Sequence, residues 1–163
     1  MFLRNSCIGR DSNDPGMEKN KGEASTMIYL TRKERFNAAH RLFIEEYSDE
    51  ENERIFGKCS NPNWHGHNYN LYVTIKGEVN PQTGFLVNLK DLRDLIREKV
   101  IDKTDHKNLN IEVDFMKDKI PTSENIAMAI WEVLEPDVKK MGCQMHKIRV
   151  EETENNFVEY YGE

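Results

Sequence analysis

The sequence contains few cysteines and no long apolar segment. Its three cysteines, Cys7, Cys59 and Cys143, are an odd number at irregular spacing. This argues against a disulfide framework and favours a reducing compartment. No apolar run approaches the length of about 18 to 20 residues that a membrane-spanning helix needs, and the first residues lack the apolar core of a secretory signal. We therefore predict a cytoplasmic protein that does not associate with membranes.

Acidic residues outnumber basic ones. The 163 residues include 23 Lys and Arg against 29 Asp and Glu, which gives a net charge of −6. A nucleic-acid partner is therefore not expected, and an anionic substrate would need a local group of Lys and Arg. The length fits one domain. Residues 1–26 are polar and show no periodicity, so we predict a disordered extension there and a single domain over 27–163.

Alternating side chains predict the strands. In residues 67–76 every second side chain is apolar or histidine, which is typical of a strand with one buried face. Residues 28–40 show the same alternation, although Arg32 and Glu34 interrupt its apolar face. The chain closes with a predicted hairpin of residues 146–152 and 157–161. In that hairpin His146 and Glu152 share the apolar face with Ile148.

Two amphipathic helices are predicted between these strand pairs. Leucines and other aliphatic residues recur at helical spacing over about 89–102. A second helix follows Pro121, because Thr122 and Ser123 offer a hydroxyl cap and Glu124 an acid in the first turn. The order ββααββ predicts an α+β fold, in which an antiparallel sheet carries two helices on one face.

Three histidines form the most informative pattern. His65 and His67 point to the same side of an extended segment, and their parity is that of the apolar face. His40 ends the other long strand and supplies a third imidazole. Three such ligands leave one tetrahedral position open, as in catalytic zinc sites, although the spacing also permits iron or copper. The alternative is three rings that are merely hydrogen-bonded.

Cys59 and the pair Asp105-His106 are the candidates for proton transfer. Cys59 is a fourth metal ligand, a buried structural thiol or a catalytic base, and Lys58 or a nearby metal would lower its pKa. A carboxylate beside an imidazole orients the ring and favours its protonated form. The alternative for Asp105 is a surface residue in a turn that ends the helix. Cys7, Cys143 and His146 are given no functional role.

Glu152 is the candidate for substrate recognition. Its carboxylate would accept two parallel hydrogen bonds from a planar N–H and NH₂ edge, as in a guanidine or pterin ring. The alternative is a solvated residue at the end of the sheet. Thr122 and Ser123 precede a helix whose free N–H groups bind ligands or are simply capped.

Several motifs together resemble the 6-pyruvoyltetrahydropterin synthase family over residues 28–163. The matching segments are 36–42, 56–59 through 68–69, 105–109, 122–125, and 152–153 followed by 155–156. The resemblance implies a tunnelling fold (T-fold), with a four-stranded antiparallel sheet and two helices. It also implies trimers whose strands continue into a barrel and that pair into a homohexamer, with active sites at the subunit interfaces.

The resemblance also implies a ligand set and a catalytic set. One Zn²⁺ per subunit would be bound by His40, His65 and His67. The catalytic thiolate would be Cys59, completed across a subunit interface by Asp105 and His106. The pterin would be anchored by Glu152, assisted by Thr122, Ser123 and Glu124.

The reaction implied is conversion of 7,8-dihydroneopterin triphosphate to 6-pyruvoyltetrahydropterin with loss of triphosphate, in tetrahydrobiopterin biosynthesis. Mg²⁺ is a candidate companion of the triphosphate. The chain departs from the family pattern at Trp64, where a small residue is common, and at Asn37, where serine is common. Rival hypotheses are 6-carboxytetrahydropterin synthase, a relative that cleaves the side chain, and a non-catalytic pterin-binding oligomer. The five residues between Cys59 and His65 favour the pyruvoyl enzyme.

Overall fold

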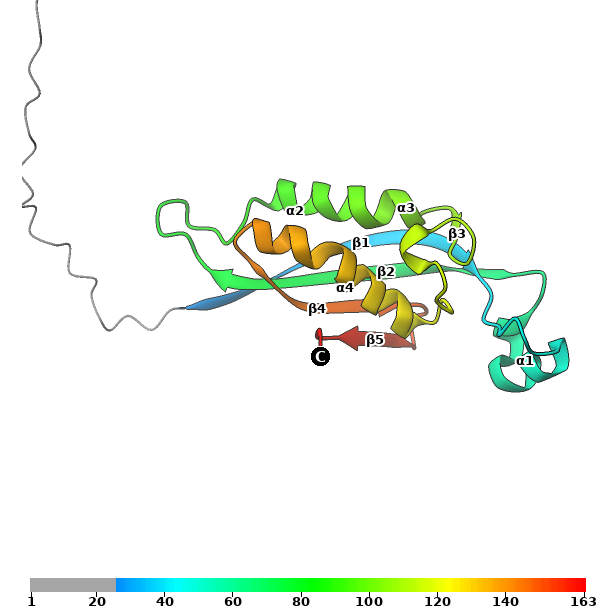
Figure 1. Cartoon of the computed structure of the whole chain (residues 1–163). Helices are drawn as coiled ribbons and strands as arrows, with labels where there is room; N and C mark the ends of the chain where they lie inside the picture. Colours follow the sequence, from blue (N-terminus) through cyan, green and yellow to red (C-terminus); the bar gives the residue numbers. More distant parts are fainter. Residues whose placement is uncertain (1–25) are drawn as a thin grey trace, which may run out of the picture.

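The computed structural model describes residues 26–163, so the disordered extension predicted for residues 1–26 lies almost entirely outside the described residues. A twisted sheet forms one layer and two long helical segments cover one of its faces (Figure 1). The strand order is β3-β1-β2-β4-β5. This confirms the predicted α+β arrangement.

The two longest strands form the centre of the sheet. β1 (Met27–His40) and β2 (His65–Glu78) pair antiparallel along their whole length, so that Met27 lies opposite Glu78 and His40 opposite His65. β4 (Gln144–Glu151) pairs with the other edge of β2, and β5 (Phe157–Tyr160) pairs with β4. The four antiparallel strands are therefore present as predicted.

A fifth strand extends this sheet. β3 (Lys107–Asn108) pairs parallel to β1 at Ala38 and Ala39. The sequence did not predict it, because a strand of two residues carries no alternation. It anchors the segment after the first long helix to the end of β1, beside His40.

Both predicted helices lie against the apolar face of the sheet (Figure 1). The first runs continuously through α2 (Leu89–Ile96), the π-helical turn η2 (Arg97–Ile101) and α3 (Asp102–Thr104). The second is α4 (Ser123–Lys140), and the side chain of Thr122 caps its first turn. Apolar side chains of both helices and of the sheet meet in one core, which includes Tyr69, Leu71, Ile75, Leu92, Ile96, Ile126, Ile130, Leu134 and Ile148. Burial of this surface is the main force that holds helices and sheet together.

Short helices occupy the connections. α1 (Asp49–Phe56) begins with a capping box formed by Ser48 and Glu51, and the turn η1 (Gly57–Ser60) follows it. Both lie beyond the end of the sheet where β1 stops and β2 starts (Figure 1). The turn η3 (Asp114–Met116) precedes α4. No helix in the described part of the chain has the length and apolarity to cross a bilayer.

The prediction that His146 lies on the apolar face of its strand, together with Ile148, was wrong. The register between β2 and β4 shifts at Thr74 and Ile75, so that Lys147 pairs with Thr74 and Met145 with Ile75. The extra residue in β4 is His146. A bulge of this kind reverses the facing of the residues beyond it. Met145 therefore enters the core, and His146 packs between Tyr29 and Tyr161 on the opposite face.

Candidate metal centre and adjoining cavity

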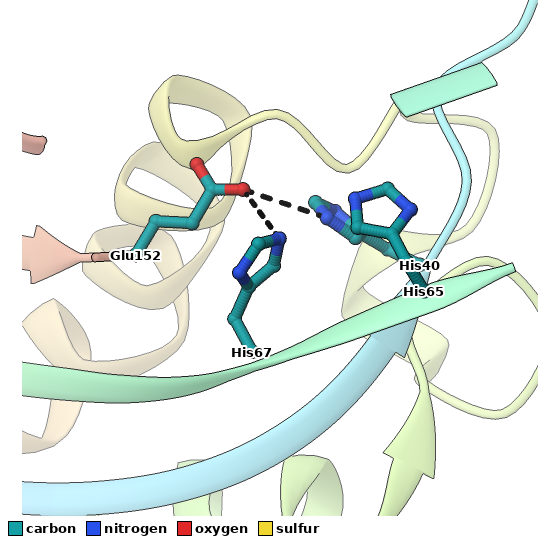
Figure 2. A group of neighbouring side chains, drawn as sticks. All are labelled: His40, His65, His67 and Glu152. Atoms are coloured by element: carbon teal, nitrogen blue, oxygen red, sulfur yellow. Dashed lines mark ion pairs between the residues drawn. The ribbon is translucent and has the colours of Figure 1, made fainter. Parts of the chain in front are cut away.

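Three strands bring four potential metal ligands together. His40 is the last residue of β1 and lies directly opposite His65, the first residue of β2. His67 follows two residues later on the same face, and Glu152 comes directly after β4. One ligand atom from each residue lies within 4.8 Å of all the others. Figure 2 shows the three rings and the carboxylate converging on one point.

Four ring nitrogens of this cluster lack hydrogen-bond partners among the residues that the structure describes. Nε2 of His40, Nε2 of His67 and both ring nitrogens of His65 are buried, and none of them makes a hydrogen bond to a described residue. Leaving such groups unpaired is costly. A cation that accepts their lone pairs removes this cost, so the donor set fits a metal ion.

The carboxylate of Glu152 also approaches these nitrogens. Its Oε1 atom lies 3.0 Å from Nε2 of His67 and 3.5 Å from Nε2 of His40. The shorter contact is close enough for a hydrogen bond but does not have the geometry of one, so Nε2 of His67 is left without a hydrogen-bond partner. Ligands of a tetrahedral zinc ion with bonds of about 2.0–2.1 Å lie roughly 3.4 Å apart. The spacing of these atoms is therefore compatible with ligands of one shared ion.

Burial favours the neutral form of two of the imidazoles, those of His40 and His65. Desolvation is the main cause that lowers the pKa of His40, and the neighbouring rings of His65 and His67 add to it, although the hydrogen bond to Pro121 opposes the shift. The pKa of His65 is lowered by burial and then by the charge of His67. Neutral imidazole is the metal-binding form. The surroundings of both rings therefore favour ligation.

Ser123 fixes the second oxygen of Glu152. The Ser123 hydroxyl, in the first turn of α4, donates to Oε2 of Glu152 at 2.8 Å. The two carboxylate oxygens thus have different surroundings, since Oε1 faces the histidines and Oε2 faces Ser123. The helix start that the sequence singled out therefore orients Glu152 as well as capping itself.

Cys59 opens into the same region. A cavity of about 430 Å³ is lined by His40, Leu42, Cys59, Thr122, Ser123, Glu124, Glu152, Asn155, Asn156, Phe157 and Val158. The turn η1 carries Cys59, and the Leu42 N–H donates to its carbonyl oxygen at 2.9 Å. Burial, and then the charge of Glu152, raise the pKa of the thiol. Lys58 is exposed and lines a separate hollow, so among the described groups it does not supply the expected activating charge.

Asp105 and His106 lie apart from Cys59 within one chain. The Asn37 N–H donates to Oδ1 of Asp105 at 2.8 Å, and the His106 N–H donates to the Asn37 carbonyl at 2.6 Å. Nδ1 of His106 lies 3.0 Å from Oδ2 of Asp105. The hydrogen bond from Asn37 is the main cause that lowers the pKa of Asp105. The His106 side chain is 81 % exposed, and neither residue lines the cavity described for Cys59.

Sequence reasoning missed the hydrogen bond that orients His40. Its Nδ1 atom lies 2.9 Å from the carbonyl oxygen of Pro121. A backbone carbonyl leaves no signal in the sequence, so only the fold could reveal this contact.

Trp64, which precedes His65 and departs from the family pattern, has φ 63°. It is not among the residues that line the Cys59 cavity.

Comparison with known proteins identifies the family. The model of the family described as 6-pyruvoyl tetrahydropterin synthase matches residues 29–163. The chain belongs to the 6-pyruvoyl tetrahydropterin synthase family. This is a family of enzymes, and the match covers the whole sheet from Tyr29 onward and both long helices.

Named relatives agree with this membership of the 6-pyruvoyl tetrahydropterin synthase family. The human 6-pyruvoyl tetrahydrobiopterin synthase is 43 % identical over 90 % of this chain and all of its own length. The protein of that name from Dictyostelium discoideum is 45 % identical over 85 % of this chain and 99 % of its own. The solved structure of 6-pyruvoyl tetrahydropterin synthase from Caenorhabditis elegans is 39 % identical, covers 85 % of this chain and 98 % of its own, and superposes with a TM-score of 0.79.

Proposed function

We propose that this protein is a metal-dependent 6-pyruvoyltetrahydropterin synthase, which converts 7,8-dihydroneopterin triphosphate to 6-pyruvoyltetrahydropterin and releases triphosphate. The observation that carries the proposal is one cavity that joins Cys59 to the cluster of His40 and Glu152. A binding protein needs a pocket, whereas a thiol beside a metal site suits proton abstraction. The names of the relatives point to the same reaction.

Zinc is the proposed metal, held by His40, His65 and His67. Neutral imidazoles with nitrogen atoms free of other partners suit Zn²⁺. When bound, the ion supplies Lewis-acid polarisation of substrate hydroxyl oxygens. The pterin is proposed to bind through Glu152, whose carboxylate Ser123 already orients. Mg²⁺ is proposed as a companion of the triphosphate.

Cys59 is the proposed base that removes a carbon-bound proton from the substrate side chain. Its thiol must be ionised for this, and in the metal-free protein burial and Glu152 oppose ionisation. The positive charge of a bound cation would favour the thiolate. His106, oriented by Asp105, is proposed to return and relay protons during the rearrangement.

The position of Asp105 and His106 supports an oligomeric active site. Because both lie outside the Cys59 cavity of their own chain, we propose that a second copy supplies them. Among the described residues, β3 covers β1 only at Ala38 and Ala39, and β5 pairs with β4 alone. Unpaired strand edges of this kind can be extended by further chains. Trimers that close into a barrel and pair into a hexamer would satisfy both requirements.

The rival activities are less well supported. The archaeal relative named as a putative 6-carboxy-5,6,7,8-tetrahydropterin synthase is 34 % identical over only 58 % of this chain. The proteins named 6-pyruvoyl tetrahydrobiopterin synthase match more of it at higher identity. A non-catalytic pterin-binding oligomer has no use for a thiol that faces the metal cluster.

The proposal is tested by replacing each described thiol in turn. Cys59→Ala should abolish triphosphate release from 7,8-dihydroneopterin triphosphate while the protein keeps its metal content. Cys143→Ala is the matched control, because Cys143 is buried in the core away from the cavity. Unchanged turnover by Cys59→Ala would refute the role of Cys59. Equal loss in both variants would indicate damage to the fold rather than to the site.

A further inference from the structure

The segment that carries Cys59 lies outside the hydrophobic core. It consists of α1 and η1, which extend beyond the end of the sheet (Figure 1). In the described part of the chain, none of the buried apolar side chains that form the core comes from residues 41–64. Packing in the core therefore does not fix the position of Cys59 against the metal cluster, and hydrogen bonds must contribute to it.

Two hydrogen bonds hold the turn on either side of the Cys59 side chain. The Leu42 N–H donates to the Cys59 carbonyl oxygen at 2.9 Å, and Nε of Arg41 donates to the Ser60 carbonyl oxygen at 2.6 Å. Ser60 is only 5 % exposed, and its hydroxyl donates to the Gly57 carbonyl oxygen at 2.8 Å, which closes the turn. Hydrogen bonds from a charged donor are roughly twice as strong as neutral ones. The guanidinium of Arg41 is therefore a strong anchor for this turn.

Arg41 is itself fixed by several contacts. Its Nη2 atom donates to Oδ1 of Asp49 at 2.9 Å, and its guanidinium carbon lies 4.6 Å from the centre of the Phe43 ring. The side-chain amide of Asn110 binds both backbone groups of Arg41. Its Oδ1 accepts from the N–H at 3.0 Å, and its Nδ2 donates to the carbonyl oxygen at 2.9 Å. The guanidinium thus starts from a backbone that is held in place.

These contacts join the thiol to the metal cluster through the backbone. Arg41 directly follows His40, the last residue of β1, and Ser60 directly follows Cys59. The residue after a metal ligand therefore binds the residue after the thiol. Because β1 is fixed at His40 by its pairing with His65, the bond from Arg41 constrains where Cys59 can lie in the cavity that it shares with His40.

We propose that Arg41 is a positioning residue that holds the Cys59 thiol against the metal cluster, and that Asn110 fixes the backbone of Arg41 for this purpose. The inference rests on the proposed role of Cys59 as the base. Proton abstraction depends steeply on placement, and a displacement of about 1 Å can cost roughly a hundredfold in rate. Arg41 does not line the cavity, so it acts through the turn and not on the substrate.

The test compares three variants of the full-length, zinc-loaded protein. Arg41→Met removes the guanidinium and keeps an apolar stem. Asp49→Ala is the matched control, because it removes one contact of the same guanidinium and leaves the bond to Ser60. Asn110→Ala releases the backbone of Arg41 and carries the same test if Arg41→Met does not fold. Each protein is treated with iodoacetamide in the absence of substrate, the rate of alkylation at Cys59 is measured by peptide mass spectrometry, and kcat and KM are measured separately.

Arg41→Met should be alkylated at Cys59 about fivefold faster, because a turn that has lost a hydrogen bond opens more often. Its kcat should fall roughly 10- to 100-fold while KM and metal content stay the same. Asn110→Ala should show the same changes to a smaller extent, and Asp49→Ala should show neither.

An unchanged alkylation rate or an unchanged kcat in Arg41→Met would overturn the inference, and so would equal changes in Asp49→Ala. A higher KM at constant kcat would also overturn it, because it would place Arg41 in substrate binding. The alkylation needs no substrate. An unaltered protein without turnover would therefore refute the proposed function and leave the alkylation result readable on its own.

Discussion

The Nδ1 atom of His40 donates a hydrogen bond to the carbonyl oxygen of Pro121, 2.9 Å away. Because a carbonyl can only accept, this contact places the proton of the neutral ring on Nδ1 and leaves a lone pair on Nε2. That lone pair points toward Glu152 and the other two rings. Pro121 directly precedes Thr122, the N-cap of α4, so the segment that starts this helix orients both Glu152 and His40.

Removal of one imidazole tests the metal centre. His65→Ala should lose its bound metal, because the remaining donors no longer surround an ion, and the metal content can be measured by elemental analysis. His65 is only partly buried, so the fold should persist. His146→Ala is the control, since His146 lies on the other face of the sheet. A His65→Ala protein with full metal content would contradict the proposed ligand set.

Two adjacent hydroxyls should have separable roles. Ser123→Ala removes the hydrogen bond to Glu152 and should raise KM for the pterin substrate about fivefold, equivalent to about 1 kcal/mol. Thr122→Ala removes the cap on the Asn125 N–H and should lower the free energy of unfolding by about 1 kcal/mol. Steady-state kinetics and denaturant unfolding of both variants separate the effects. The same pattern of losses in both would show that the two hydroxyls act together.

The backbone conformation of His106 should lower the free energy of unfolding, while its side chain has the proposed catalytic role. Its φ of 60° lies in the left-handed region, which costs a residue other than glycine about 1 kcal/mol. The side chain is largely exposed, so its loss removes little packing. His106→Gly should raise the free energy of unfolding by about 1 kcal/mol and abolish turnover. His106→Ala, which keeps the strain, should lose turnover without that gain, and equal stability of both variants would contradict the account.

Acid should weaken the polar face of the sheet through Glu151. Burial pushes its pKa upward, but hydrogen bonds from Arg149, Tyr72 and Asn70 outweigh it, and the net effect is a pKa below the ordinary value near 4.5. Stability from this group is therefore present above pH 4.5 and lost as the pH falls through the lowered pKa. Glu151→Gln should remove that dependence. Urea unfolding at a series of pH values checks it, and parallel curves for both proteins would contradict it.

The sequence predicted the elements whose residues carry a strong period. The alternation in residues 67–76 placed His67 and Tyr69 on one face, and the structure confirms it. The helix start at Thr122 and the helical spacing after Leu89 were also confirmed. Binary patterns of this kind are local, so a single sequence suffices to read them.

Features that depend on pairing or on backbone groups could not be predicted. The bulge at His146 appears only when β4 is aligned with β2. The π-helical turn at Arg97 and the two-residue strand β3 have no periodic signal. The approach of Glu152 to the histidines joins residues far apart in the chain. The zinc identity, the hexamer, the cytoplasmic location and the catalytic roles stay predictions.

Identification of the pterin product tests the central claim most directly. Zinc-loaded protein is incubated with 7,8-dihydroneopterin triphosphate, and the pterin is identified by mass spectrometry alongside a Cys59→Ala control. The account predicts 6-pyruvoyltetrahydropterin and free triphosphate from the unaltered protein and neither from the variant. A carboxy- or hydroxymethyl-pterin, or no product from a folded and metal-containing protein, would contradict it.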